Sequence, residues 1–133
     1  ENYNAKEEIE ARHKLIVDGK YKIKTDPVAI EELSDILALA RKHDIKILAY
    51  YYPVHKKIFE THQYQVEIKR YRAQVEELLT SDDVVLDFNT EEFNYIRDDY
   101  ETYSDVSHLS SVGGNRLIRV IQEYIYKYNL NIL

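Results

Sequence analysis

The stretch that decides the fold reads Ile45-Lys-Ile-Leu-Ala-Tyr-Tyr-Tyr-Pro53. It is a short, mostly apolar run that ends at a proline and lies between two segments of helical character. A run of this kind is typical of a buried strand in a parallel sheet. A second run, Val84-Val-Leu-Asp-Phe88, follows the next helical segment. The two runs therefore predict a pair of parallel strands.

Helical patterns surround both runs. Asp26-Pro27 combines a favourable N-cap with a proline at the first helical position, and residues 41–43 are basic, as suits a helix end. The apolar residues that repeat at helical spacing between these signals are Ile30, Leu33, Ile36, Leu37 and Ala40. We expect helices at residues 6–15, 27–43, about 56–80 and 112 to about 128, the last capped by Ser111.

Two further predicted helices have a clear apolar face. The residues that we expect to be buried are Tyr64, Ile68, Tyr71, Val75 and Leu78 in the long helix, and Leu117, Ile121, Tyr124, Ile125 and Tyr128 in the last one. Asp18-Gly19 predicts a turn. Residues 21–24 predict a short edge strand or an extended connection, and residues 89–111 predict a long loop with at most one helical turn near 91–96.

The order of elements is helix, strand, helix, strand, long loop, helix. Such alternation predicts an α/β fold, with a parallel sheet in αβα layers joined by right-handed crossovers. Only two strands are evident, and a two-stranded parallel sheet is a poor independent domain. We therefore expect an incomplete α/β domain, with residues 1–26 as an N-terminal helix and connection and 27–133 as the C-terminal half.

Composition excludes several classes of function. The net charge of −6 argues against generic nucleic-acid binding, which needs a basic surface. The absence of cysteine excludes disulfides, thiolate metal sites and a cysteine nucleophile. No apolar stretch approaches the roughly 18 residues of a membrane span, and no signal segment opens the chain. Since the chain also lacks methionine, we expect it to be a trimmed or processed piece.

Asp105-Val-Ser-His108 is the main candidate for chemistry. It lies in the long segment after the second strand, and ligands of open α/β sheets bind beyond the carboxyl ends of strands. A histidine can act as general base near neutral pH, and a carboxylate can orient it. The alternative is a turn in which Asp105 accepts backbone hydrogen bonds and His108 is simply exposed. No cofactor and no metal site is indicated.

The surroundings of this pair favour the catalytic interpretation. Asp105-x-x-His108-Leu-Ser, the pair Gly113-Gly114, the apolar last helix and the strand that ends in Pro53 together resemble the SGNH (GDSL-type) hydrolases and O-acyltransferases. Within that superfamily the pattern, over roughly residues 27–128, is most similar to the cell-surface acylation group. This group includes DltD-type proteins of teichoic-acid D-alanylation and the alginate O-acetylation proteins.

The resemblance implies roles for both residues. His108 would be the general base and Asp105 its orienting carboxylate, with an acyl-serine intermediate and ester hydrolysis or O-acyl transfer as the outcome. It also implies an acyl donor, a polysaccharide or polymer acceptor, a membrane-bound acyltransferase as partner, and an extracytoplasmic location.

The chain departs from that family in one major respect. The nucleophilic serine of the family lies in a Gly-Asp-Ser-like block, and neither this block nor the oxyanion blocks can be found in the printed sequence. The only glycines are Gly19, Gly113 and Gly114, and none precedes an Asp-Ser. We therefore expect this chain to be inactive by itself.

Further candidates are weaker. His55 and Tyr52, just after or within the first strand, could contact a substrate, although a surface histidine is the simpler interpretation of His55. The acids at 98, 99, 101 and 105 are best explained as solvated side chains rather than a cation site. The alternative function is a non-catalytic α/β interaction or carbohydrate-binding domain with tyrosine-rich edges, and an exposed sheet edge would allow homodimers.

Overall fold

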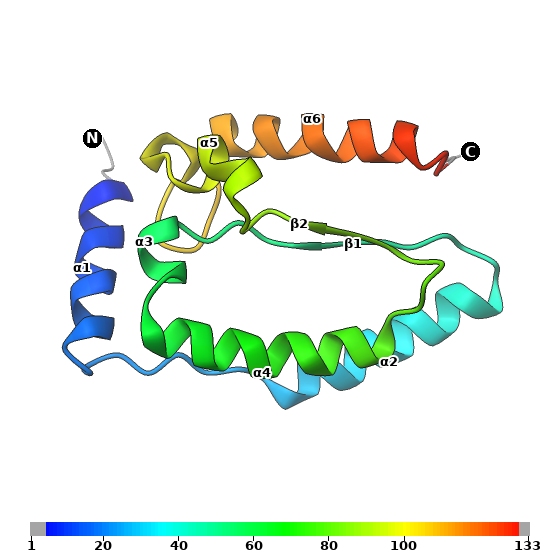
Figure 1. The fold of residues 1–133 in the computed structure, drawn as a ribbon, viewed down its shortest axis with the longest axis horizontal. Coiled ribbons are helices and arrows are strands. Elements are labelled where there is room, and N and C mark those ends of the chain that lie inside the picture. Colours follow the sequence, from blue (N-terminus) through cyan, green and yellow to red (C-terminus); the bar gives the residue numbers. More distant parts are fainter. Residues whose placement is uncertain (1–4, 131–133) are drawn as a thin grey trace.

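The two predicted strands pair in the structure, a computed structural model that describes residues 5–130 (Figure 1). The fold is mixed α/β and mostly helical, with one small parallel sheet. In chain order the elements are α1 Ala5–Val17, α2 Pro27–Lys42, β1 Leu48–Tyr51, α3 Lys56–Phe59, α4 His62–Leu78, β2 Val84–Asp87, η1 Glu91–Phe93, α5 Asn94–Arg97, η2 Tyr100–Thr102 and α6 Ser111–Lys127.

The sheet is formed by β1 and β2 alone in the described part of the chain. Leu48 pairs with Val84 and Tyr51 with Asp87, in parallel register. Both strands are shorter than the apolar runs that predicted them. After Tyr51, the side chain of Asn89 takes the place of backbone hydrogen bonds between the two segments. Its Nδ2 donates to the Tyr52 carbonyl at 2.8 Å, and its Oδ1 accepts from Val54 N at 2.8 Å.

The N-terminal part of the fold follows the local signals in the sequence. Asp26 caps α2 by accepting the Val28 N–H at 3.0 Å, as its place before Pro27 predicted. Gly19 ends the turn after α1 with a φ of 70°, a conformation that glycine adopts at little cost. Residues 21–24 form a connection without regular secondary structure and not a strand. Within α2, Leu37 is buried, whereas Ile36, a member of the same apolar repeat, is 64% exposed.

The predicted helix at 56–80 is wrong as a single element, because it is divided into α3 and α4. Thr61 has extended backbone angles, φ −64° and ψ 144°, and interrupts the helical hydrogen bonds. Its hydroxyl donates to the Ile58 carbonyl at 2.7 Å and so satisfies the end of α3. The face of α4 predicted to pack inward is buried or half-buried throughout, with Val75 the most enclosed.

The segment at 89–111 is more ordered than expected. It contains η1, α5 and η2 where at most one helical turn was predicted. Thr102, in η2, is fully buried and its hydroxyl donates to the Ile96 carbonyl at 2.6 Å. Such a side chain has no clear sequence signal, because its burial depends on the packing of segments around it.

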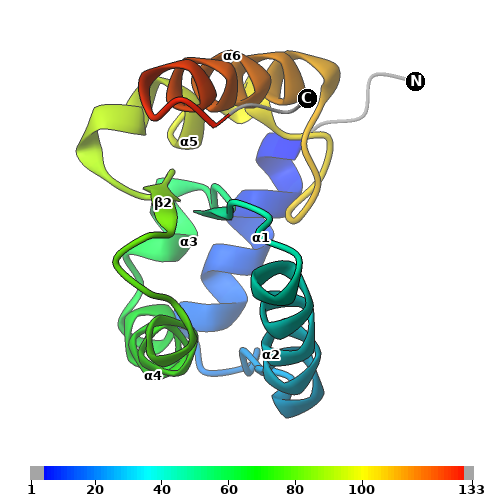
Figure 2. The same cartoon turned by 90° about the vertical axis from the view of Figure 1, so that its right-hand side faces the viewer.

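Two hydrophobic clusters hold the elements together. Figure 2 shows α6 on one side of the strands and α2 and α4 on the other. The first cluster joins β2, the short helices and α6 through Leu86, Phe88, Phe93, Ile96, Leu117 and Val120. The second joins α1, α3 and the segment before α6 through Ala5, Ile9, Ile16, Ile58 and Tyr103. Tyr128 is 46% exposed, so its predicted burial is wrong.

No helix within residues 5–130 has the length and apolarity that a membrane crossing requires.

Candidate active site

Asp105 and His108 are in direct contact. The Nδ1 of His108 lies 2.8 and 3.0 Å from the two carboxylate oxygens of Asp105. This contact joins residues three apart, so one short loop supplies both side chains. The geometry is that of a histidine whose orientation and tautomer are set by a carboxylate, with Nδ1 as the donor.

Asp105 also forms the turn that the alternative interpretation predicted. Its Oδ1 accepts the N–H groups of Ser107 at 2.8 Å and His108 at 2.7 Å. The Ser107 N–H, followed by the hydrogen bond with the His108 ring, holds the pKa of the Asp105 carboxyl below its usual range. The carboxylate therefore stays ionised near neutral pH while it stabilises the loop and orients His108.

The ring of His108 is open to a reactant. Its side chain is 75% exposed, whereas that of Asp105 is 32% exposed. Among residues 5–130 no hydrogen bond occupies Nε2, so this nitrogen is free to accept a proton. Ser107 Oγ lies 3.4 Å from His108, but at Nδ1, the nitrogen that Asp105 occupies, and thus cannot be the serine that Nε2 would deprotonate.

The backbone around the pair is tied to the end of η2 and to the start of α6. An isolated antiparallel bridge joins Tyr103 and Leu109, and the Ser104 N–H donates to the His108 carbonyl at 2.9 Å. Ser110 then caps α6 by accepting the Gly113 N–H at 3.1 Å. The cap was expected at Ser111, one residue later. The turn around Asp105 thus leads directly into the first residues of α6.

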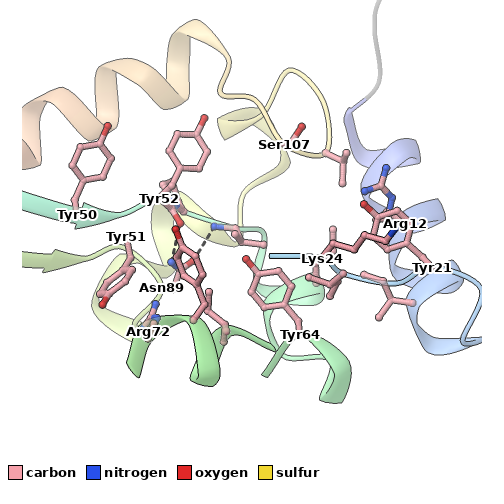
Figure 3. Close-up of a pocket in the computed structure, with 18 residues that line it drawn as sticks. Arg12, Tyr21, Lys24, Tyr50, Tyr51, Tyr52, Tyr64, Arg72, Asn89 and Ser107 are labelled. Carbon is pink, nitrogen blue, oxygen red and sulfur yellow. Dashed lines mark hydrogen bonds between the residues drawn. The ribbon is translucent and has the colours of Figure 1, made fainter. Parts of the chain in front are cut away.

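A cavity of about 470 Å³ opens beside this loop, within the usual size of ligand sites (Figure 3). Val106 and Ser107 form its wall on the loop side. The rest of the lining includes six tyrosines, Tyr21, Tyr50, Tyr51, Tyr52, Tyr64 and Tyr71, and six aliphatic or proline residues, Ile16, Ile23, Pro53, Val54, Ile58 and Ile68. Three cations, Arg12, Lys24 and Arg72, also line it, and no acidic side chain does among the described residues.

Tyr52 connects the cavity with the loop. It is 39% exposed, lines the cavity, and its hydroxyl accepts the Leu109 N–H at 3.0 Å. Partial burial raises the pKa of the Tyr52 hydroxyl, which therefore stays protonated at neutral pH. The prediction that Tyr52 contacts a substrate is not tested by this geometry, but its place beside the cavity is compatible with that role.

His55 lies in the interior and not at the surface. It is 3% exposed, so the interpretation as a surface histidine beside two lysines is wrong. Its Nδ1 accepts the Lys57 N–H at 3.1 Å and caps α3, and its ring stacks on Tyr100 with 4.4 Å between centroids. His55 is not in the lining of the cavity. Burial holds the pKa of His55 below its usual value, although Asp98 opposes this shift.

Asn89 is a residue that sequence reasoning missed. It is buried, lines the cavity, and fixes the backbone of Tyr52 and Val54 through the two hydrogen bonds described above. The signal in the sequence was available: a polar residue directly after the second strand, at the carboxyl edge of the sheet.

The acidic residues at 98, 99, 101 and 105 do not converge on one site, and three of them contact different partners. Asp99 binds Arg116 at 2.7 Å, Asp105 binds His108, and Asp98 is half exposed with an oxygen 3.9 Å from the ring of His55. Within the described part of the chain, no group of three or more metal-ligating side chains is assembled.

Comparisons with protein-family models, with curated proteins and with solved structures found no match to this chain.

Proposed function

We propose that Asp105 and His108 are two members of a Ser-His-Asp acyl-transfer site, as the resemblance to SGNH hydrolases and O-acyltransferases implies. The observation that carries the proposal is the contact of Asp105 with Nδ1, which leaves Nε2 of an exposed ring free. An unoriented surface histidine would not have this arrangement. The position of α6 and α4 on opposite sides of the parallel strands also supports an SGNH-like layered fold.

In the proposed reaction, Nε2 of His108 removes the hydroxyl proton of a serine as the serine oxygen attacks the ester carbonyl. Asp105 stabilises the imidazolium that forms, and His108 then returns the proton to the leaving alcohol. A water or an acceptor hydroxyl releases the acyl group from the serine by the same steps in reverse. The serine would come from another polypeptide segment, because no Gly-Asp-Ser block is present in the printed sequence.

The proposed substrate is an acylated cell-surface polysaccharide or polymer. Tyrosine rings can pack against sugar faces while their hydroxyls bind sugar oxygens, and six of them line the cavity next to the loop. By resemblance, the protein acts outside the cytoplasm, with an acyl donor supplied by a membrane-bound acyltransferase.

The direct test is made in the organism that encodes the chain. His108→Gln and Asp105→Asn are introduced separately, and ester-linked acyl groups on cell-surface polymers are released with mild base and quantified. We expect both variants to lower the acyl content if the protein is a transferase, or to raise it if it is an esterase.

His62→Gln is the matched control, since His62 is an exposed histidine at the start of α4. It should leave the acyl content as in the wild type. If His108→Gln protein accumulates normally and the acyl content of the cells does not change, the proposed function is wrong.

A carbohydrate-binding domain without catalysis is the second candidate. The tyrosine-lined cavity favours it, as do the exposed rings of Tyr50 and Tyr52, although Tyr103 is buried in the core and cannot belong to a binding surface. Titration with neutral and acidic oligosaccharides, followed by NMR, tests this candidate. Binding that persists in the His108→Gln variant, together with unchanged acyl content in cells, would favour it over the enzyme.

A further inference from the structure

The peptide unit that follows His108 is held at both ends. Its carbonyl, from His108, accepts the Ser104 N–H at 2.9 Å, and its N–H, from Leu109, donates to the Tyr52 hydroxyl at 3.0 Å. The His108 N–H itself donates to Asp105 at 2.7 Å. The main chain on both sides of the imidazole is therefore fixed by hydrogen bonds.

We define the Asp-His loop as residues 104–109. Of these three hydrogen bonds, only that between Leu109 N–H and the Tyr52 hydroxyl joins the loop to a residue outside it. The other external hydrogen bond to the loop within residues 5–130 joins Val106 N to the Glu8 carboxylate, at a long 3.4 Å. Leu109 adds apolar contacts with both hydrophobic clusters. In the described part of the chain, Tyr52 is thus the one hydrogen-bonded link between the sheet end and the residues that flank His108.

Tyr52 is itself held in place. It follows β1 directly, and Asn89 binds its carbonyl, so the backbone that carries the ring belongs to the rigid carboxyl end of the sheet. Figure 3 shows the side chains of Tyr50 and Tyr52 extending in the same direction from the strand, while Tyr51 extends in the opposite direction. Only Tyr52 reaches the loop: the described residues provide no hydrogen-bond partner for the Tyr50 hydroxyl.

We propose that Tyr52 is a positioning residue, which sets the orientation of the Asp105–His108 pair by accepting the Leu109 N–H. A catalytic pair needs its loop held close to one geometry, and a bond to a rigid strand provides this where the loop alone would sample several. This inference rests on the proposed function for its catalytic meaning, but the coupling between Tyr52 and the pair can be measured without any activity.

The test compares Tyr52→Phe with Tyr50→Phe, each of which removes one hydroxyl from the same face of the same strand. In wild type the ¹⁵N shifts of the His108 ring should report a proton held at Nδ1, and the carboxyl of Asp105 should titrate with a lowered pKa. In Tyr52→Phe we expect the ring to populate both tautomers and the Asp105 pKa to rise toward its usual value. Tyr50→Phe should leave both unchanged.

These two readouts separate positioning from a simple loss of stability. A substitution that only lowers the free energy of unfolding does not change the tautomer or the carboxyl pKa of the molecules that remain folded. If Tyr52→Phe folds and matches Tyr50→Phe in both measurements, the positioning role is wrong.

A measurement on the wild type covers the case in which Tyr52→Phe does not fold. The amide of Leu109 should exchange with solvent roughly five- to tenfold more slowly than an unbonded loop amide, as one hydrogen bond to a fixed acceptor would require. An unprotected Leu109 amide would overturn the proposal. Tyr52→Phe could change the His108 tautomer and the Asp105 pKa while His108→Gln leaves the cellular acyl content unchanged. In that case the positioning role is supported and the proposed acyl transfer is wrong.

Discussion

At the scale of single residues, Gly113 determines how closely α6 approaches the segment before it. A Cβ at this position would overlap the carbonyl of Thr102, whereas one at Gly114 would have no atom within 4 Å. Both glycines lie in the first turn of α6, next to the Asp-His loop. The pair therefore offers a substitution and its control in adjacent positions.

We expect Gly113→Ala to destabilise the protein by about 1–3 kcal/mol, because backbone atoms must move to admit the methyl group. Gly114→Ala should instead stabilise it by about 0.5–1 kcal/mol, since alanine favours a helix. Urea denaturation of both variants measures these changes. Equal effects of the two substitutions would show that the close approach to Thr102 has no energetic consequence.

His55 makes stability depend on pH. Its Nε2 is buried without a hydrogen-bond partner among the described residues, and Asp98, Asp99, Lys57 and Arg97 are the charges around it. Because the folded-state pKa of His55 lies below its ordinary value of 6.5, the unfolded chain binds the proton more readily. Stability is thus highest above pH 6.5 and falls as the pH drops from there through the folded-state pKa.

We expect the thermal midpoint to fall between pH 7 and pH 5, and to fall less in His55→Asn. Asparagine can still accept the Lys57 N–H as a cap but does not titrate. Loss of the stacking on Tyr100 should lower the midpoint of this variant at every pH, so the slope is the informative quantity. His62→Asn should retain the wild-type slope; an identical slope in His55→Asn would contradict this account.

At the scale of elements, the N-cap of α6 is a residue that the sequence alone does not identify and the packing does. Ser110 and Ser111 are adjacent serines before an apolar helix, and either could serve as the cap. The structure uses Ser110, whose hydroxyl also donates to the Glu101 carbonyl. The second bond exists only because η2 packs against α6, which decides between two otherwise equivalent residues.

We expect Ser110→Ala to lower the free energy of unfolding by about 1 kcal/mol or somewhat more, as the loss of a cap does. Ser111→Ala should change it by less than about 0.5 kcal/mol, since no hydrogen bond of its side chain is lost in the described structure. Thermal or urea unfolding of both variants provides the comparison. A larger loss of stability in Ser111→Ala than in Ser110→Ala would show that Ser111 is the cap, as predicted from the sequence.

At the scale of the whole molecule, β1 has one free edge. The carbonyls of Ile47 and Tyr51 accept hydrogen bonds from the Val84 and Phe88 N–H groups of the neighbouring segment. Because the backbone groups of a strand alternate in direction, the N–H and C=O groups of Leu48 and Tyr50 point away from β2. Within residues 5–130, nothing pairs with that edge. Unpaired edges of this kind promote association with other strands.

We expect concentration-dependent self-association through this edge, detected by light scattering. Tyr50→Pro removes the outward N–H without removing a β1–β2 bond, and should weaken association. Tyr50→Thr is the control, because it also removes the ring but keeps the N–H. A wild-type protein that stays monomeric at high concentration, or equal association of the two variants, would contradict the expected homodimer.

The parts that the sequence determined by itself are local. Asp26-Pro27 begins α2, Gly19 ends the first turn, and the two apolar runs form strands, because each depends on residues only a few positions apart. Asp105 and His108 are also close in sequence, three positions apart within one turn. The sequence therefore indicated the candidate catalytic pair before any tertiary contact was known.

Only the tertiary structure decided what surrounds that pair. Tyr52 and Leu109 are 57 positions apart, and their hydrogen bond requires β1, the loop and α6 to meet. The burial of His55, the choice of Ser110 as cap and the tyrosine-lined cavity likewise depend on packing between distant segments. Periodicity reports which residues share a face of a helix or strand, but not which neighbouring element that face will meet.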